Sequence, residues 1–220
     1  MLTLLLLSAS LRATPAASRP SLEARVPEAS RAAVAAGLTA WENAVASGAV
    51  RRTDVLTVID YSRPSTEPRL FVLDVADGKV RYAERVAHGR GSGENATERF
   101  SNRDGSRMTS IGVFRAAESY LGHHGVSLRL DGLEPGFNDR ARERAIVLHG
   151  AEYVNTQIVA AQGRLGRSWG CPAVRPEIAR EIIDAIKDAA PIWKREVEGE
   201  QRRWVKGSVP GSPAPEEAGG

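Results

Sequence analysis

Short β-prone segments separated by turn signals constrain the fold of this chain more than any other feature. Two apolar or β-branched runs, 54–61 and 69–75, are separated by a stretch with two prolines. Asp77-Gly78 then gives a hairpin signal before a third run. The remaining strand candidates are 80–87, 109–116, 126–130 and 144–148. Many short strands in succession predict a mainly antiparallel β domain, either a sandwich or a barrel-like sheet.

Helical periodicity appears only before and after these strands. Residues 28–47 carry Val34, Leu38, Trp41 and Val45 at steps of three and four, with Pro27 before them and Gly48 after. Residues 176–189 place four isoleucines on one face and predict a helix that packs across the sheet. The fold class is therefore mainly β (α+β) with flanking helices. Residues 89–105 are expected to form a long loop, and 192–205 fit either a strand or a frayed helix.

The two ends differ in composition from the middle. Residues 2–11 are apolar and are followed by small residues, which is typical of a secretory signal peptide and too short for a membrane span of about twenty residues. The usual positive n-region is missing, so the segment fits a tether or a misassigned start as well. We expect a leader at 1–17, a linker and helix at 18–52, the main domain at 53–192, and an extension with a disordered tail at 193–220.

Charge excludes one class of partner. The 220-residue chain has a net charge of +3 and a pI of about 9.3, with arginines and lysines spread along its length. No basic run alternates with aromatics and no zinc-finger spacing occurs, so nucleic-acid binding is not expected. We expect an exported monomer with no integral membrane span.

Cysteine chemistry is the main indication of function. Cys171 is the only cysteine, and it stands between Gly170 and Pro172. A thiol needs a neighbouring base to become a nucleophile, and His149, 22 residues earlier at the end of an apolar run, is the candidate. Free cysteines are often only small buried hydrophobes, but Pro172 fits poorly inside a central strand. An unpaired cysteine in an exported chain also favours a reactive role.

Several motifs around this pair resemble one family. The chain contains His149-Gly150 and Gly166-Arg167-Ser168-Trp169-Gly170-Cys171-Pro172-Ala173-Val174. It also contains His88 to Gly93, Phe100-Ser101-Asn102, Thr109 to Gly112 and Gly125 to Leu130. These segments resemble the YkuD-type L,D-transpeptidases, in the murein L,D-transpeptidase catalytic domain branch, over roughly residues 53–190. The chain departs from the better-known branch at Ala173, where an arginine is usual, and in its longer His-to-Cys spacing.

The resemblance implies a role for each motif residue. Cys171 is the nucleophile and His149 its base, with the main-chain carbonyl of Gly150 fixing the imidazole tautomer. Main-chain N–H groups of Gly170 and Cys171 would stabilise the oxyanion, at about 3 kcal/mol per donor. Ser168 fits either a substrate contact or a structural turn, and Trp169 either an acyl-pocket wall or loop packing. The remaining expected substrate contacts are His88, Asn102, His124 and Arg167.

A metal site is not expected. His88, His123 and His124 together with Cys171 have suitable zinc ligands, but no pair has helical or C-x-x-C spacing. We expect neither a metal nor another cofactor.

The function implied by the resemblance is acyl transfer on peptidoglycan stem peptides in the periplasm or cell envelope. A Cys171 thioester would form from a tetrapeptide stem and pass to an acceptor amine. Two alternatives remain: an L,D-carboxypeptidase that passes the thioester to water, and a non-catalytic wall-binding module with the same fold.

Overall fold

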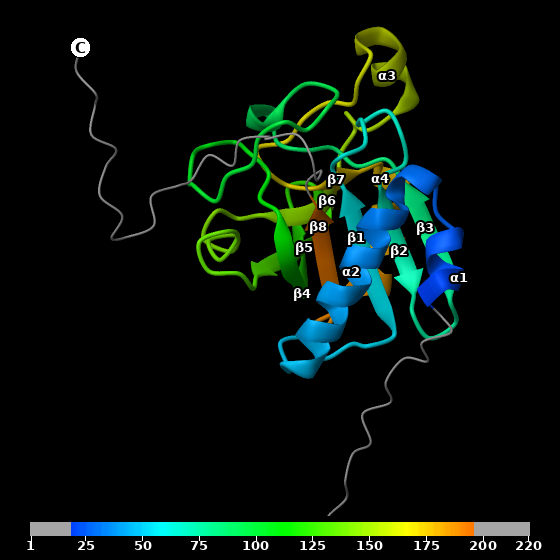
Figure 1. Ribbon diagram of the computed structural model, residues 1–220. Helices are drawn as coiled ribbons and strands as arrows, with labels where there is room; N and C mark the ends of the chain where they lie inside the picture. Colours follow the sequence, from blue (N-terminus) through cyan, green and yellow to red (C-terminus); the bar gives the residue numbers. More distant parts are fainter. Residues whose placement is uncertain (1–18, 196–220) are drawn as a thin grey trace, which may run out of the picture.

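One eight-stranded sheet organises the chain in the computed structural model, which describes residues 19–195. Its order is β3-β2-β1-β8-β4-β5-β6-β7 (Figure 1). The strands are β1 (Val55–Asp60), β2 (Leu70–Asp74), β3 (Lys79–Glu84), β4 (Gly112–Gly122), β5 (Gly125–Gly132), β6 (Val147–Gly150), β7 (Ala173–Val174) and β8 (Pro191–Arg195).

Most neighbouring strands are antiparallel, and two pairs are parallel. β8 lies between β1 and β4, parallel to β1, and β7 pairs in parallel with the edge of β6. Bridges from Ala87 to Ala173 and from Gly89 to Ser168 connect the segment after β3 to the β7 end. The sheet is therefore nearly closed, which confirms the predicted barrel-like β fold.

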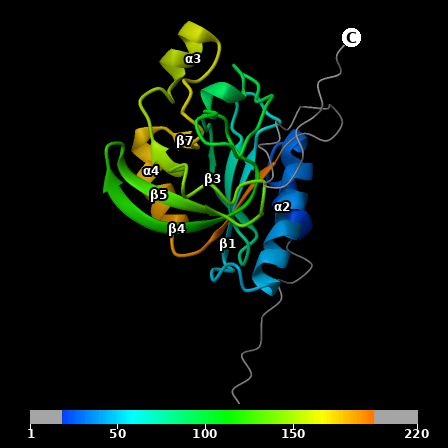
Figure 2. The same cartoon turned by 90° about the vertical axis from the view of Figure 1, so that its left-hand side faces the viewer.

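Helices cover both faces of this sheet. They are α1 (Arg19–Ala24), α2 (Glu28–Ala46), α3 (Thr156–Gln162) and α4 (Pro176–Ile186). Figure 2 shows α2 on one side of the sheet and α4 on the other. Leu38 and Trp41 of α2 pack with Val58 and Phe71 on the outer face. The isoleucines of α4 enter the main core with residues such as Phe114 and Leu148.

Local chemistry explains where the helices begin and end. Pro176 occupies the first turn of α4, where its missing N–H would have no helical acceptor. In α3, the side chain of Asn155 accepts a hydrogen bond from Ile158 N at 2.7 Å, and Gly163 ends the helix at φ 67°. Both ends of α3 are thus readable from the sequence, although the helix was not predicted.

The elements differ from the sequence predictions in several places. Helix α1 lies in the stretch expected to be a linker, because Leu22 and Val26 find apolar cover against the outer face of the sheet. The strand predicted at 144–148 begins only at Val147, since Ala145 has a positive φ of 51°. The two-residue β7 was missed, and residues 191–195 are a strand. The predicted leader at 1–17 and tail from 196 lie outside the described residues.

Removing a core side chain of α4 should destabilise the fold. Ile182 is fully buried, so Ile182→Ala should lower the free energy of unfolding by about 2–5 kcal/mol through lost burial and the cavity left behind. Urea denaturation followed by circular dichroism measures this. Glu181→Ala, on the exposed face of the same helix, is the control and should change stability by less than about 0.5 kcal/mol. Equal losses in the two variants would contradict the placement of α4 in the core.

Candidate active site

His149 is held by strand β6. The residue is 97% buried. It pairs with Ser127 of β5 on one side and with Ala173 of β7 on the other. Its Nδ1 lies 2.8 Å from the carbonyl oxygen of Gly150. Because a carbonyl only accepts, this contact places a proton on Nδ1 and leaves Nε2 as the basic nitrogen.

The turn that carries Cys171 is joined to the same strand. His149 N donates to Pro172 O at 3.4 Å, and Val147 N donates to Cys171 Sγ at 3.5 Å. Since Ala173 pairs with His149, Cys171 lies two residues back along the strand direction, or about 6.6 Å. The structure therefore brings the cysteine and the histidine to one region of the sheet edge.

The sulfur is turned toward the main chain in this structure. Besides accepting from Val147 N, Cys171 Sγ lies 3.7 Å from the carbonyl oxygen of Ala145, to which the thiol donates. Ala145 adopts a left-handed conformation, which a non-glycine residue rarely does without a local reason. In this conformation the carbonyl oxygen of Ala145 accepts the hydrogen bond that the protonated thiol of Cys171 donates.

Burial keeps both groups neutral at rest. Desolvation raises the pKa of the Cys171 thiol, while the Val147 N–H and the charges of Lys194 and Arg144 lower it in part. Desolvation also lowers the pKa of His149, while the hydrogen bond to the Gly150 carbonyl raises it in part. A neutral imidazole can take a proton from a neutral thiol, as a general base requires.

His124 covers the imidazole of His149. The two rings are stacked, with centroids 4.4 Å apart and an interplanar angle of 25°, and His123 contacts His124 edge-on at 5.2 Å. His124 belongs to the exposed turn between β4 and β5. A cavity of about 400 Å³ opens here and is lined by His124, Gly150, Glu152 and Arg180, among others.

The cysteine turn is shaped by Ser168. Ser168 Oγ donates to Cys171 O at 2.6 Å and accepts from Gly170 N at 3.1 Å. The Gly170 N–H expected to face an oxyanion is thus engaged within the turn, whereas Cys171 N–H has no acceptor among residues 19–195. Gly170 has φ 131°, and a Cβ there would lie 2.8 Å from Met108 O, so only glycine fits. Of the two readings for Ser168, the geometry favours the structural turn.

Trp169 is presented at the surface beside the cysteine. Its side chain is 70% exposed, and the guanidinium of Arg107 lies 5.0 Å from the ring centroid. The ring is therefore free of the packing contacts that a core indole would make.

His88 has an internal role instead of the expected substrate contact. It is fully buried, and its Nδ1 accepts from Arg69 Nη2 at 2.8 Å while Nε2 faces Gly93 O at 3.3 Å. Arg69 is also fully buried and donates twice to Val86 O. Burial, followed by the Arg69 charge, lowers the pKa of His88 to about 3.

Asn102 and Arg167 also bond within the protein. Asn102 Nδ2 donates to Asp139 at 2.6 Å, and Asn102 Oδ1 accepts from Arg140 N at 3.3 Å. Arg167 bonds to Gly93 O and forms an ion pair with Glu94. Both side chains anchor the 89–105 segment, so their positions give the substrate-contact prediction no support.

Two cations near the sulfur escaped the sequence analysis. Arg144 donates to Ser101 O and Met108 O at 2.8 and 2.7 Å. Lys194 of β8 is buried with its Nζ 3.8 Å from the Phe114 ring centroid. Strand alternation from Ile192 would have placed Lys194 on the inner face, had residues 191–195 been assigned as a strand.

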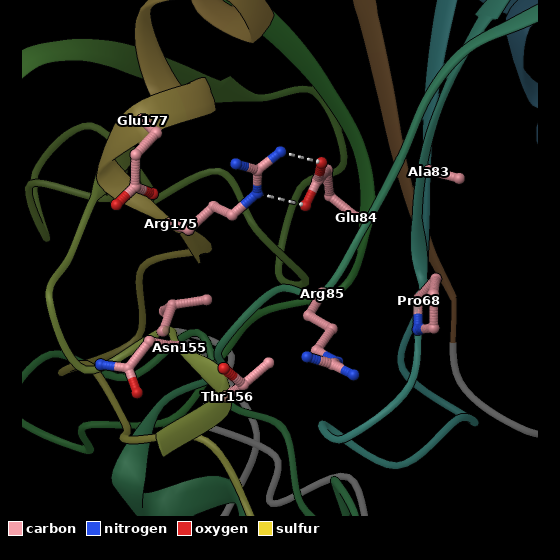
Figure 3. Close-up of a pocket in the computed structure, with 9 residues that line it drawn as sticks. Pro68, Ala83, Glu84, Arg85, Asn155, Thr156, Arg175 and Glu177 are labelled. Carbon is pink, nitrogen blue, oxygen red and sulfur yellow. Dashed lines mark hydrogen bonds and ion pairs between the residues drawn. The ribbon is translucent and has the colours of Figure 1, made fainter. Parts of the chain in front are cut away.

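A separate cavity lies at the seam between β3 and the start of α4. Its volume is about 440 Å³, and Figure 3 shows Arg175 reaching across it to Glu84. The pair is bidentate, with N–O distances of 2.8 and 3.1 Å. Arg175, the arginine nearest to the expected position after Cys171, is therefore engaged away from the sulfur.

Within residues 19–195, no three His, Cys, Asp or Glu side chains gather as metal ligands. No helix in that range has the length and hydrophobicity to cross a bilayer.

Comparison with known proteins identifies the family of this chain. The YkuD_2 family model, described as an L,D-transpeptidase catalytic domain, matches residues 26–194. The chain belongs to this family. A search of curated proteins found no match.

Several solved structures are similar to this chain at low sequence identity. An L,D-transpeptidase from Mycobacterium smegmatis is 17% identical, with 65% of this chain and 59% of that chain covered and a TM-score of 0.41. L,D-transpeptidase 1 from Mycobacterium tuberculosis is 16% identical, with 65% and 62% covered and a TM-score of 0.37. The helical cell shape determining protein Pgp2 (K307A mutant) from Campylobacter jejuni is 16% identical, with 68% and 50% covered and a TM-score of 0.44. The chain thus spans less than two thirds of the length of these proteins.

Acid should destabilise the fold through His88. Its folded pKa of about 3 lies below the ordinary 6.5, so the unfolded chain binds a proton that the folded chain excludes between these values. Stability should therefore fall as pH drops from 6.5 toward 3, by up to about 1.4 kcal/mol per pH unit for this group. Urea denaturation at several pH values measures the slope. His88→Gln should flatten it, the exposed His123→Gln should not, and an unchanged slope in His88→Gln would contradict the assignment.

Removing the His124 ring should raise the pKa of His149. His124→Ala exposes the imidazole to water and removes a neighbouring charge, and both changes favour the protonated form. The chain has only four histidines, so NMR titration of the ring protons can follow His149 directly. His123→Ala, whose ring contacts His124, is the control and should have a smaller effect. A lowered His149 pKa in His124→Ala would refute this account.

Proposed function

We propose that this protein is a cysteine-dependent peptidoglycan L,D-transpeptidase. The observation that carries the proposal is the joining of the Cys171 turn to β6 beside His149, whose Nδ1 is held by Gly150 O. Membership of the L,D-transpeptidase catalytic domain family supports the same reaction class. A peptidoglycan substrate in turn implies work outside the cytoplasm, in the periplasm or cell envelope.

The first half-reaction forms a thioester. His149 Nε2 takes the thiol proton, and Cys171 Sγ attacks the carbonyl that joins the L-centre of the third stem residue to a terminal D-alanine. The sulfur must first leave the Ala145 carbonyl, its acceptor at rest. The C–N bond then breaks, and D-alanine departs as an amine with the proton held by His149.

The second half-reaction uses the thioester carbonyl. An amine from another stem loses its proton to His149 and attacks, so that an amide forms and the thiol is regenerated. If water attacks instead, the product is a trimmed stem, and the protein is an L,D-carboxypeptidase. The two outcomes share every residue of the first half-reaction.

The turn that carries Cys171 stabilises the tetrahedral oxyanion. The Cys171 N–H is the available main-chain donor, because Gly170 N–H is bonded to Ser168 Oγ. One such donor contributes about 3 kcal/mol to transition-state stabilisation. Trp169 and His124, both exposed beside the site, are the side chains best placed to contact a stem peptide.

Incubation with purified tetrapeptide stems tests the proposal. Mass analysis should detect cross-linked dimers or trimmed stems, together with a thioester on the wild-type chain. Cys171→Ala should reduce turnover by more than about 10⁴-fold, as loss of a covalent nucleophile does. Imipenem should acylate the wild-type protein at Cys171 and leave Cys171→Ala unmodified.

The outcomes separate the alternatives. Trimmed stems without dimers would indicate the carboxypeptidase. A folded wild-type protein with neither turnover nor an imipenem adduct would leave only a wall-binding module, and turnover that persists in Cys171→Ala would refute the nucleophile. Arg175→Ala, which breaks the ion pair with Glu84, is the matched control and should keep activity.

A further inference from the structure

Arg107 places an unpaired positive charge beside the cysteine turn. Its guanidinium lies over the Trp169 ring, 5.0 Å from the ring centroid, and Trp169 is two residues before Cys171. The Arg107 side chain is exposed, and no carboxylate pairs with it within residues 19–195. Its N–H donors therefore face solvent next to the nucleophile.

The main chain of Arg107 is held tightly against this turn. Arg107 O accepts from Gly91 N at 2.9 Å, and a Cβ at Gly89 would lie 2.5 Å from the same oxygen. The next carbonyl oxygen, Met108 O, would lie 2.8 Å from a Cβ on Gly170. These close approaches of main chain to main chain fix the base of the Arg107 side chain next to the cysteine turn.

Arg107 also adopts an uncommon backbone conformation. Its φ is 55°, in the left-handed region that residues with long side chains rarely occupy. Backbone strain of this kind concentrates at active sites and ligand clamps, where it holds a side chain in a required position. The side chain held here is a cation beside a nucleophile.

Most other cations near the turn are already engaged. Arg144 donates to two carbonyls, and Arg167 and Arg175 each pair with a glutamate. Arg90 is exposed, and its main-chain N–H donates to Ser168 O, so it is the competing candidate for binding an anion here. Within the described part of the chain, however, it is the Arg107 guanidinium that lies over the indole.

The substrate of the proposed reaction carries an anion close to the bond that breaks. The departing D-alanine is the last residue of the stem, so two atoms separate its carboxylate carbon from the attacked carbonyl carbon, a distance of less than about 4 Å. A group that binds this carboxylate must therefore lie near Cys171 Sγ. The Cα atoms of Trp169 and Cys171 are at most about 7 Å apart, which is within the reach of an arginine side chain.

A guanidinium has the geometry that such a carboxylate requires. Its planar fork of N–H donors can bind both carboxylate oxygens at once. Because these donors point outward in the plane of the group, the fork stays available when a face of the guanidinium lies on an aromatic ring. The indole of Trp169 can thus support the Arg107 side chain without occupying its donors.

We propose, on the basis of the function given above, that Arg107 binds the terminal carboxylate of the donor stem and that Trp169 supports its guanidinium. The contact selects stems that end in a free carboxylate. It also orients the neighbouring scissile carbonyl toward Cys171.

The test compares a tetrapeptide stem with the same stem whose terminal carboxylate is replaced by an amide. Wild-type protein should use the acid about tenfold better in kcat/KM, mainly through a lower KM, because the amide loses charge-assisted hydrogen bonds. Equal use of the two stems by the wild type would overturn the proposal, and this comparison does not require any variant to fold.

Arg107→Gln assigns the preference to one residue. This variant should lower the acid-to-amide ratio to about one by slowing turnover of the acid alone. The ratio is measured within each protein, so a difference in the amount of folded protein cancels. An unchanged ratio in Arg107→Gln would overturn the proposal.

Two further arginines serve as controls. Arg103→Gln changes an exposed arginine of the same loop that has no ion pair in the described residues, and it should keep the wild-type ratio. Arg90→Gln should keep most of it. A ratio that falls in Arg90→Gln and survives in Arg107→Gln would overturn the assignment to Arg107.

Binding measurements separate this proposal from the proposed reaction. In Cys171→Ala, titration calorimetry should show about tenfold tighter binding of the acid than of the amide, and adding Arg107→Gln should make the two equal. That result, together with a wild-type protein that does not turn over stems, would refute the transpeptidase and leave the carboxylate site. Turnover without a preference between the stems would refute the carboxylate site and leave the transpeptidase.

Discussion

The pairing of β7 with β6 is the constraint on which the site depends. β7 has only two residues, yet it is held on one side by His149 N to Pro172 O and Ala151 N to Val174 O, and on the other by Ala87 N to Ala173 O. These bonds fix the distance between the cysteine turn and the histidine strand. The nearly closed sheet supplies rigidity, and α4 fills its inner face directly after the turn.

Polar groups around β6 and β7 hold the cysteine turn and the neighbouring loop in place. The Ser168 hydroxyl, Gly170 and the Ala145 carbonyl set the shape of the turn and the resting direction of the sulfur. The buried Arg69 and His88 hold the 89–105 segment in place with neutral or internally satisfied contacts. Trp169, next to Cys171 in the chain, and His124, stacked on His149, are exposed.

Local sequence signals identified β1 to β6 and the two main helices, because periodicity and turn chemistry act over a few residues. They also singled out Cys171 and His149 as candidates, and the structure places both at the β6–β7 edge. The roles of His88, Asn102 and Arg167 were not readable, since a motif does not show whether a side chain points inward. Lys194 and Arg144 were missed for a related reason. Lys194 enters the core because β8 is inserted between β1 and β4, and Arg144 lies in the turn that leads into β6; no local pattern encodes either placement.

Strand β8 also determines when the sheet is complete, because it lies between β1 and β4. Without it, β1 and β4 would have unpaired edges, and β1 to β3 would be joined to β4 to β7 only through the bridges at the β7 end. Such long-range closure is slow, and open edges invite pairing with other chains. The sheet is therefore complete only after residues 191–195 have paired with β1 and β4. The same segment brings the buried Lys194 over the Phe114 ring, so completion of the sheet also completes this part of the core.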